Sequence, residues 1–542
     1  MNRIIILQEF EKMFPMTKVF DIGGNDMYIY DAKSNLLANI TFDEIYQILK
    51  YYSEENSSSH NSPSYISDLI DKGIFLPGPL KQIVPEDDEI INMIEDDFEN
   101  YIPRTLMIEV TERCNLACRY CFFSKEDGFK DRQHSFIKID KLVAFKAIDI
   151  YYKRYIGHLS KYANDKRKLI IKRTPPSLQW WGGEPFLAFD IIVQTKEYFE
   201  SLDWEKYGIS KKELIYGLSS NLTVFNSEIL KFLFENKIRL KVSIDGNEDS
   251  HDKNRVFLNG EGTFKIVIKN IMKIIEDYPT YAKSYVGIQA VLADNVNKEK
   301  SIEFINNLFK LNSPGKKILT CSFFPQRKTG VFISDLEKNT DSIEENVYKF
   351  KKNMDKISSK SYEELSVLFN DNISLFANLK TIICIEDYLT LDDPSGSDFL
   401  SRSFSCPLGV DTMFVSATGH MYCCCKTDYS FPIGHIETGI SISELKDVYS
   451  LYYDKVRSQC NSCWAHNFCT ICPALVGANG NFNLPIKTEC SYIKKSVLIR
   501  LIKYVILKNE YNHLYSNILY ISEINNVPET DSKPLNLKEE IK

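Results

Sequence analysis

From Leu106 onward, short apolar runs alternate with longer segments in which apolar residues recur at helical spacing. The short runs predict strands at 106–110, 177–183, 216–221, 239–246, 285–293 and 318–325. Helical spacing is clear between them, as in "KLVAFKAIDIYYKRY". Strands that alternate with helices form parallel sheets, and six such units suffice for a partly closed barrel. We therefore predict an α/β fold built on a partial (β/α)6 TIM-type barrel, with its chemistry at the C-terminal ends of the strands.

The first 85 residues follow a different pattern. "MYIYDAKSNLLANI" alternates about a turn at 32–35, which predicts a hairpin, and "TFDEIYQILKYY" is a helix opened by a threonine cap. Strands with short helices predict a winged-helix-like α+β module over 1–85. The segment that follows its hairpin carries no basic recognition face, so DNA binding is not favoured.

The remaining segments complete the predicted organisation. An acidic linker with a solvated helix spans 86–103, and the barrel spans 104–336. A mostly helical insertion covers 337–400, a cysteine-rich domain 401–495, and a helix with a flexible tail 496–542. Within the barrel, the basic run 161–173 predicts a solvated hairpin or a docking surface for an acidic electron donor.

Charge and hydropathy exclude several classes of protein. The 66 basic and 73 acidic residues give a net charge of −7, which argues against a surface that coats nucleic acid. No apolar run reaches the ~18–20 residues of a membrane span. No signal peptide is evident at the N-terminus. We expect a cytoplasmic protein with no membrane or nucleic-acid partner.

The chain contains 14 cysteines, which in the absence of an export signal indicate metal or catalytic use. Three lie within eight residues, and nine lie between Cys406 and Cys490. Cys321 and Cys384 stand alone, as small buried hydrophobic residues often do.

The stretch "TERCNLACRYCFF" holds Cys114, Cys118 and Cys121 at a C-x3-C-x2-C spacing. Thiolates at this spacing can face one metal centre from a tight loop. A zinc ion needs a fourth ligand, and the nearest histidine, His134, is a poor match for it. An iron–sulfur cube held by three thiolates leaves one iron open to a ligand from outside the protein.

Polar motifs follow the next three predicted strands. "GGEP" (182–185) ends the second, "SSN" (219–221) the third and "SIDG" (243–246) the fourth. Because the C-terminal ends of parallel strands meet at one mouth, these residues and the cysteines are expected to share a site.

With these motifs in place, the sequence resembles the radical S-adenosylmethionine (SAM) superfamily. The resemblance rests on the three cysteines and on an aromatic residue, Tyr120, before the last of them. It implies a [4Fe–4S] cluster whose open iron is chelated by the amino and carboxylate groups of SAM. Reductive cleavage of SAM then yields a 5′-deoxyadenosyl radical, and the protein orients and shields this chemistry.

The resemblance also implies which residues hold SAM. Its methionine amino group is assigned to Gly182, Gly183, Glu184 and Pro185. Ser220 and Asn221 fall where the family often has Thr-Asn-Gly, although Leu222 replaces the glycine. Ser243 and Asp245 suit the ribose hydroxyls or the methionine carboxylate. "HDKNR" (251–255) with "GEGTF" (260–264) is typical of peptide-modifying members, and Arg255 pairs either with the methionine carboxylate or in a surface ion pair.

The C-terminal cysteines resemble the SPASM domain, which carries two auxiliary iron–sulfur clusters in peptide maturases. One cluster is assigned by analogy to Cys460, Cys463, Cys469 and Cys490, and the other to Cys406, Cys424 and Cys472. Two residues separate the last two cysteines of the C-x2-C-x5-C-x2-C run, where three are usual. The fourth ligand of the second cluster is open between Cys384, a substrate thiolate, and Cys423 or Cys425, whose side chains would point away from Cys424 in a strand. A zinc ribbon is the competing interpretation.

The N-terminal module resembles leader-peptide recognition elements, which bind a peptide as an added strand. We therefore expect a radical SAM maturase that crosslinks a ribosomal precursor peptide, with a thioether as the leading product and a ferredoxin or flavodoxin as electron donor. One alternative is Cys or Ser oxidation, as in anaerobic sulfatase maturases, which carry an acidic base where this chain has Cys425, followed by Lys426. The other is a zinc-stabilised peptide-binding protein without catalysis.

Overall fold

The computed structural model describes most of the 542 residues. The described residues are 3–22, 26–53, 68–69, 72–80, 85–121, 123, 131–293, 295–310, 320–325, 327–328, 331–332, 342–371, 379, 382–383, 385, 389, 408–427, 429–469, 471, 477–478, 481–482 and 487–525.

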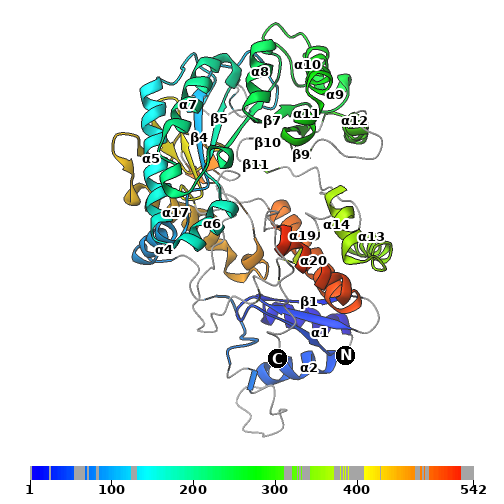
Figure 1. Ribbon diagram of the computed structural model, residues 1–542. Coiled ribbons are helices and arrows are strands. Elements are labelled where there is room, and N and C mark those ends of the chain that lie inside the picture. Colours follow the sequence, from blue (N-terminus) through cyan, green and yellow to red (C-terminus); the bar gives the residue numbers. More distant parts are fainter. Residues whose placement is uncertain are drawn as a thin grey trace.

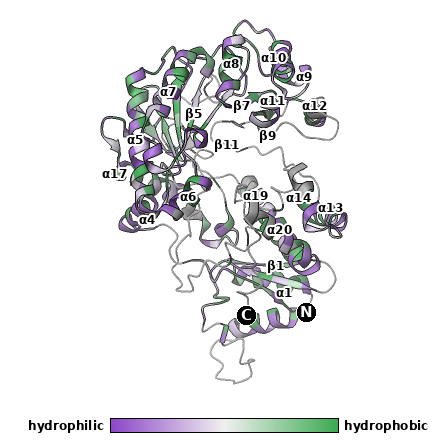
Figure 2. Ribbon diagram, viewed as in Figure 1, coloured by the Kyte–Doolittle hydropathy of each residue, from purple (hydrophilic) through white to green (hydrophobic). Residues whose placement is uncertain are grey.

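Six strands run parallel to one another, as predicted, and form the barrel in the upper part of Figure 1. They are β4 (Thr105–Thr111), β5 (Ser177–Gly182), β6 (Ile215–Ser220), β7 (Arg239–Ser243), β8 (Val286–Leu292) and β9 (Thr320–Pro325), hydrogen-bonded in that order. The helices between them are α5 (Lys141–Ser160), α6 (Asn164–Arg173), α7 (Phe189–Ser201), α8 (Ser227–Glu235), α9 (Glu248–Asp252), α10 (Phe264–Asp277), α11 (Pro279–Tyr285) and α12 (Lys298–Lys310). Figure 2 shows the apolar strands covered by helices whose outer faces are polar.

Strand alternation separates a helix-facing side from an inner side that lines the barrel lumen. In β4 the buried apolar residues Leu106, Ile108 and Val110 pack under the helices. Met107 and Glu109 alternate with them and face the lumen. The same alternation in β5 sends Trp180 outward and Trp181 inward, where Trp181 lines the main cavity.

The cysteine-rich segment continues the barrel sheet instead of forming a separate one. β12 (Thr412–Val415) pairs with β4 in parallel, and β13 (His420–Tyr422), β14 (Pro432–His435) and β15 (Gly439–Ile440) follow antiparallel. The result is a ten-stranded mixed sheet with the order β15-β14-β13-β12-β4-β5-β6-β7-β8-β9. The prediction of a mostly parallel barrel is therefore confirmed in part, since the free edge of β4 takes four further strands.

The N-terminal module is a three-stranded antiparallel sheet with two helices. Its elements are α1 (Arg3–Met13), β1 (Thr17–Asp21), β2 (Met27–Asp31), β3 (Leu36–Ile40) and α2 (Phe42–Ser53). The hairpin β2–β3 and the helix α2 are confirmed, whereas α1 and β1 were not predicted. Thr41 caps α2, because its hydroxyl accepts from the Glu44 N–H at 3.2 Å while the Glu44 carboxylate accepts from the Thr41 N–H at 2.7 Å.

The acidic segment forms α4 (Asp87–Asn100), a helix as predicted, but it is not simply solvated. Ile90 and Ile94, four residues apart, are 1 % exposed. They turn one face of α4 toward α17 (Ile442–Tyr452), and Lys446 pairs with Asp87 at 2.9 Å. The many acidic residues of this segment made the apolar stripe of Ile90 and Ile94 difficult to recognise in the sequence.

The basic run 161–173 is also corrected, because it is the helix α6 and not a hairpin. α6 leads into β5 and so lies at the N-terminal ends of the parallel strands, opposite the end where the three cysteines follow β4. That placement disfavours electron delivery from this helix to the three-cysteine loop.

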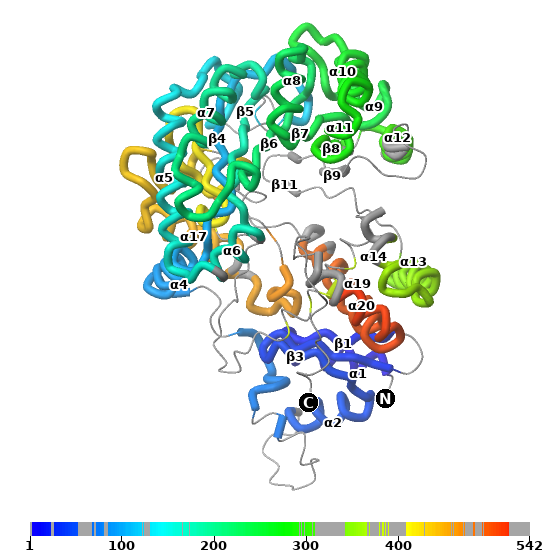
Figure 3. Tube along the Cα trace, in the orientation of Figure 1, coloured from blue at the N-terminus to red at the C-terminus, as the bar shows by residue number. Residues whose placement is uncertain are grey.

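The C-terminal part contributes α13 (Ile343–Asp355), α14 (Tyr362–Asp371), α19 (Lys487–Glu510) and α20 (Asn512–Asn525), and the single C-terminal helix predicted is thus two. Short pairs β10 (Arg327–Lys328) with β11 (Val331–Phe332), and β16 (Gly477–Ala478) with β17 (Asn481–Phe482), complete the strands. α19 and α20 lie between the N-terminal sheet and the barrel (Figure 3), where Asn509 donates to the Tyr28 hydroxyl at 2.6 Å. The predicted tail lies almost entirely outside the described residues. Among the helices of the described part, none is long and apolar enough to cross a membrane.

Candidate active site

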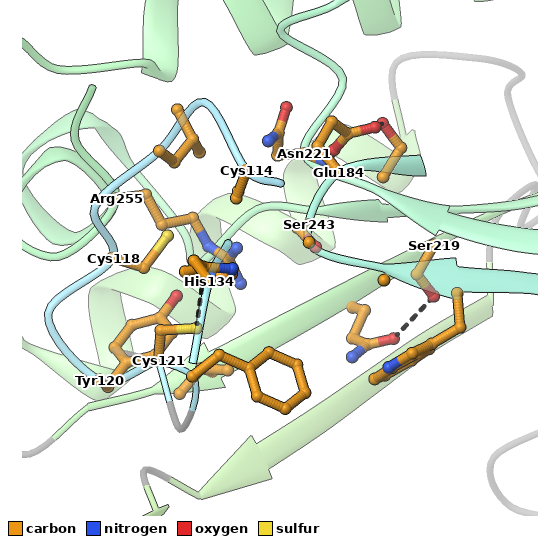
Figure 4. Close-up of a pocket in the computed structure, with 18 of the residues that line it drawn as sticks. Cys114, Cys118, Tyr120, Cys121, His134, Glu184, Ser219, Asn221, Ser243 and Arg255 are labelled. Atoms are coloured by element: carbon orange, nitrogen blue, oxygen red, sulfur yellow. Dashed lines mark hydrogen bonds between the residues drawn. The ribbon is translucent and has the colours of Figure 1, made fainter. Parts of the chain in front are cut away.

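The three cysteines of the C-x3-C-x2-C loop line one cavity of about 300 Å³ at the C-terminal ends of the strands (Figure 4). The hairpin that follows α9 pins this loop, since Ala117 and Arg119 donate their N–H groups to Val256 and Asn254 at 2.8 and 3.0 Å. Burial raises the pKa of Cys118 to about 12 and that of Cys114 further. Thiolates in so dry a site require a cation beside them.

The three thiols fit the donor set of an iron–sulfur cluster. A [4Fe–4S] cube binds each of its thiolates to a different iron, so the thiolates surround the cube. Three thiols around one cavity match that requirement.

His134 lies closer to the cysteines than its position in the sequence indicated. Its Nε2 is 3.5 Å from the Cys121 sulfur, and its Nδ1 is 3.0 Å from the Glu112 carbonyl oxygen (Figure 4). A carbonyl can only accept, so Nδ1 is the donor. Burial lowers the pKa of His134. The separation of 13 residues between Cys121 and His134 in the sequence gave no indication of this contact.

The Gly182–Gly183 strip is pressed against the backbone that leads into Cys114. A Cβ at Gly182, where φ is +141°, would lie 2.0 Å from the Thr111 carbonyl oxygen. One at Gly183 would lie 2.4 Å from the Arg113 carbonyl oxygen. These carbonyls accept from the N–H groups of Gly183 and Glu184, both at 2.9 Å. Only glycine permits this approach.

Glu184 joins the ends of the second and third barrel strands. Its carboxylate, 1 % exposed, accepts from the Ser220 hydroxyl at 2.8 Å and from the Asn221 N–H at 2.7 Å. Burial raises the pKa of Glu184 to about 7. Leu222 has a φ of +56°, so this chain keeps the left-handed backbone that the family's glycine favours. Pro185 opens a short 3-10 turn behind the strip.

Asp245, Tyr120 and Arg255 form a buried cluster on the other side of the three-cysteine loop. Arg255 Nε lies 3.0 Å from the Asp245 carboxylate, which also accepts from the Tyr120 hydroxyl and from the Val291 N–H. The nearby Asp245 carboxylate raises the pKa of Arg255 against the opposing effect of burial. Arg255 is 8 % exposed, so a surface ion pair is wrong. Asp245 is already satisfied within the protein, while Ser243 and Arg255 face the cavity.

The "HDKNR" and "GEGTF" motifs fold onto each other and position Arg255. Asp252 accepts from the N–H groups of Thr263 and Phe264 at 2.7 and 2.8 Å. A Cβ at Gly262 would lie 2.1 Å from that carboxylate. His251 is fully buried between the Asp245 N–H and the Thr263 hydroxyl. The two motifs lie close together in the sequence because their residues pack against each other in this hairpin.

The prediction that the Cys425 side chain points away from Cys424 in a strand is wrong, because the chain turns after Tyr422. β13 ends at Tyr422, so strand alternation does not apply beyond it, and the thiols of Cys424 and Cys425 are hydrogen-bonded to each other. Lys426 follows directly and lines the cavity.

Arg132, which the sequence did not single out, holds this turn. Its guanidinium donates to the carbonyls of Cys425 and Thr427 at 2.6 and 2.8 Å and pairs with Glu109 at 2.9 Å. It is 2 % exposed and lies 4.3–5.0 Å from the ring centres of Phe123, Tyr429 and Phe414.

The other predicted cluster ligands are only partly described. Cys460, Cys463 and Cys469 lie in a tight loop of 3-10 turns, and Cys490 lies in α19. All four are partly buried. Cys406, Cys472 and Cys384 lie outside the described residues. Whether two auxiliary clusters form here stays a prediction.

Residues 108–308, from β4 to α12, match the family model described as the Radical SAM superfamily. This part of the chain is therefore a radical SAM domain, a type of domain that implies a [4Fe–4S] cluster and SAM. The chain is 27% identical over 206 residues to a cysteine-type anaerobic sulfatase-maturating enzyme of Clostridium novyi, covering 38% of this chain and 47% of the relative. It is 23% identical over 282 residues to the radical SAM cyclopropyl synthase TigE of Paramaledivibacter caminithermalis, covering 49% and 52%. The chain thus spans about half the length of these curated relatives.

Two solved structures are similar at a lower level. Native anSMEcpe with bound AdoMet matches with a TM-score of 0.49 and 17% identity, over 77% of this chain and 100% of that one. Streptococcus suis SuiB bound to the precursor peptide SuiA matches with a TM-score of 0.38 and 13% identity, over 86% and 95%.

Proposed function

We propose that this protein is a radical SAM maturase that crosslinks a ribosomally made peptide. The observation that carries the proposal is one cavity lined both by the three-cysteine loop and by Lys426 of the cysteine-rich segment. A site shared by these two parts of the chain suits a substrate segment threaded between them.

The cluster and SAM would supply a 5′-deoxyadenosyl radical that takes a hydrogen atom from a substrate carbon. In our proposal Cys114, Cys118 and Cys121 bind the cluster, and the 182–185 strip binds the methionine amino group. Ser220, Asn221 and Ser243 contribute polar contacts to SAM. The Asp245–Tyr120 pair keeps Arg255 oriented beside Cys118, which it contacts by a hydrogen bond.

The flanking segments take the roles that the sequence suggested. The N-terminal module, within 1–85, is proposed to bind the leader of the precursor peptide. The segment 401–495 is proposed to hold two auxiliary clusters, one of them on Cys460, Cys463, Cys469 and Cys490. A ferredoxin or flavodoxin is the proposed electron donor.

The bond formed is proposed to be a thioether. Loss of one hydrogen atom from a substrate carbon and of a proton and an electron from a cysteine thiol joins carbon to sulfur, and the electron leaves through an auxiliary cluster. Oxidation of a single Cys or Ser is the alternative, as the names of several relatives suggest. It is disfavoured because the position that carries an acidic base in that chemistry, directly after the cysteine of the G-x4-C element, is Cys425 here, followed by Lys426.

Iron analysis with EPR after anaerobic reconstitution tests the proposal. We expect about twelve irons in the wild type and about eight in the Cys114/Cys118/Cys121→Ala variant, which also loses SAM cleavage. Cys321→Ala is the matched control and should keep both, because Cys321 lies in β9 and belongs to none of the predicted ligand sets. Zinc in place of iron would refute the proposal.

Mass spectrometry on a modified peptide distinguishes the two chemistries. A crosslink removes two hydrogens and protects one thiol from alkylation, whereas single-residue oxidation converts that residue to an aldehyde and joins nothing.

A further inference from the structure

One face of the N-terminal sheet packs against the loop 460–469, which carries three predicted cluster ligands. Strand alternation in β2 places Ile29 in the module's own core and Tyr30, which is 0% exposed, on the opposite face. The ring of Tyr30 lies 5.2 Å from that of Phe468, and both belong to one hydrophobic core. Cys463 and Cys469 are partly buried against the same core. The contact between the module and this loop is therefore dry.

The loop 460–469 consists of consecutive tight turns. The N–H of Cys463 donates to the Cys460 carbonyl at 3.0 Å. The next two turns are closed in the same way, from His466 to Cys463 at 3.1 Å and from Cys469 to His466 at 3.2 Å. Three thiols gathered in one short loop suit the donor set of an iron–sulfur cluster. The loop contains only short 3-10 turns, so its shape depends on contacts from outside.

The N-terminal module supplies such contacts to both halves of the loop. The side-chain amide of Asn467 donates to the Tyr30 hydroxyl at 3.0 Å and to the Ala32 carbonyl at 2.9 Å. The Leu80 N–H donates to the Asn461 carbonyl at 2.8 Å. Asn461 lies within the C-x2-C part of the loop and Asn467 within the C-x5-C part that follows. Each interval between two cysteines is thus tied to the module by at least one hydrogen bond.

The hairpin turn that receives Asn467 is itself fixed. Tyr30 donates its hydroxyl to the Asn35 side chain at 2.9 Å, so the same oxygen accepts from Asn467 through a lone pair. The Ser34 N–H donates to the Asp31 carboxylate at 3.1 Å across the turn. Because these bonds hold the turn in one shape, the module sets the position of Asn467.

We propose that the N-terminal module is a structural part of an auxiliary iron–sulfur site, with Asn467 as its positioning residue. The docked hairpin holds the loop in the shape in which Cys460, Cys463 and Cys469 bind one cluster. This inference rests on the auxiliary cluster of the proposed function, and it gives the module a role besides peptide binding. A change in the hairpin would then disturb a cluster even when no peptide is present.

Iron analysis and EPR in the Cys114/Cys118/Cys121→Ala background test this inference, because only the auxiliary sites remain there and no SAM chemistry takes place. After anaerobic reconstitution the background should hold about eight irons. Asn467→Asp keeps the size of the side chain but removes both donors. Added to the background, it should lower the iron content to about four and remove one of the two EPR signals of the reduced protein. The cluster that remains shows that the chain is folded.

A milder variant changes the module and leaves the loop itself intact. Tyr30→Phe keeps the buried ring and removes only the hydroxyl that accepts from Asn467. In the same background it should retain about eight irons. A chelator should then remove one cluster about fivefold faster than from the background, as expected for the loss of one hydrogen bond.

Asn509→Asp is the matched control. Asn509 of α19 donates to the Tyr28 hydroxyl of the same strand β2 at 2.6 Å, outside the loop 460–469. This variant breaks a similar link to the module and should keep about eight irons and both signals. Full iron and both signals in Asn467→Asp would overturn the inference. So would an equal loss in Asn509→Asp, or a background that binds no iron and so has no cluster to position.

The two proposals fail separately. A wild-type protein that never cleaves SAM, together with a loss of one cluster in Asn467→Asp, refutes only the proposed function. A wild-type protein that crosslinks a peptide, together with full iron in Asn467→Asp, refutes only the role of the module in the auxiliary site.

Discussion

At the residue scale, the fold of the barrel mouth depends on the neutral form of His251. Its two ring nitrogens contact the Asp245 N–H and the Thr263 hydroxyl, and no water reaches it. Burial lowers the pKa of His251 from 6.5 to about 4, with Asp245 opposing the shift and Arg255 adding to it. The neutral imidazole is therefore part of the folded site.

This shift predicts a loss of stability in mild acid. Between pH 6.5 and 4 the unfolded chain binds a proton at His251 that the folded chain excludes, so stability is intact above 6.5 and falls below it. From pH 7 to 5 the loss is about 2 kcal/mol, at 1.36 kcal/mol per pKa unit. Thermal unfolding at the two pH values measures it.

The variant His251→Gln supplies the comparison for this prediction. It keeps one donor and one acceptor but has no proton to gain, so its melting temperature should fall less between pH 7 and 5. An equal fall in both proteins would assign the acid sensitivity to other groups.

At the scale of elements, the contact between the β4 and β5 ends depends on glycines. Gly183 has no positive φ that a side chain would strain, so the cost of substitution there is purely steric. The predicted Cβ lies 2.4 Å from the Arg113 carbonyl oxygen, which is backbone and cannot rotate away. Gly183→Ala should therefore push the strip away from Cys114 and lower iron retention.

Gly157→Ala provides the matched control for that prediction. Gly157 lies within α5, and a Cβ there meets nothing within 4 Å. Alanine at a helix interior is worth about 0.5–1 kcal/mol over glycine, so this variant should melt higher and keep its iron. If both variants retained the wild-type iron content, the close approach of the strip would not matter for cluster binding.

The elements also show what the sequence could and could not predict. The six barrel strands were found because each is a compact apolar run, and the cysteine loop and "GGEP" strip were found because they follow strands directly. The pairing of β12 with β4 was missed, since it joins residues about 300 positions apart. The contact between the Cys424 and Cys425 thiols was missed because it depends on β13 ending at Tyr422.

At the scale of the molecule, the cysteine-rich segment contacts both the N-terminal module and the barrel through individual side chains. Asn467, within the Cys463–Cys469 loop, donates to the Tyr30 hydroxyl and the Ala32 carbonyl of the N-terminal module, at 3.0 and 2.9 Å. The ring of Phe468 packs 5.2 Å from that of Tyr30. A predicted cluster loop and a predicted peptide-binding module thus share one interface. Contacts of this range leave no pattern in either segment alone, which is also why Arg132 was overlooked.

Arg132 joins the barrel to the cysteine-rich segment, and its loss should weaken the whole assembly. Arg132→Met leaves the Glu109 carboxylate buried without its cation and frees two carbonyls of the Cys425–Thr427 turn. Removing one partner of a buried pair costs about 3–5 kcal/mol. We expect a marked drop in melting temperature, measured by thermal unfolding.

A double-mutant cycle separates the buried charge from the lost packing. Glu109→Gln combined with Arg132→Met removes both charges while keeping the size of both side chains. The double variant should therefore melt above Arg132→Met alone, since no uncompensated carboxylate remains. The carbonyls of Cys425 and Thr427 would still lack their donor, so the double variant should melt below the wild type. If it melted no higher than Arg132→Met alone, the loss of these two contacts and of packing, and not the uncompensated Glu109 charge, would account for the destabilisation.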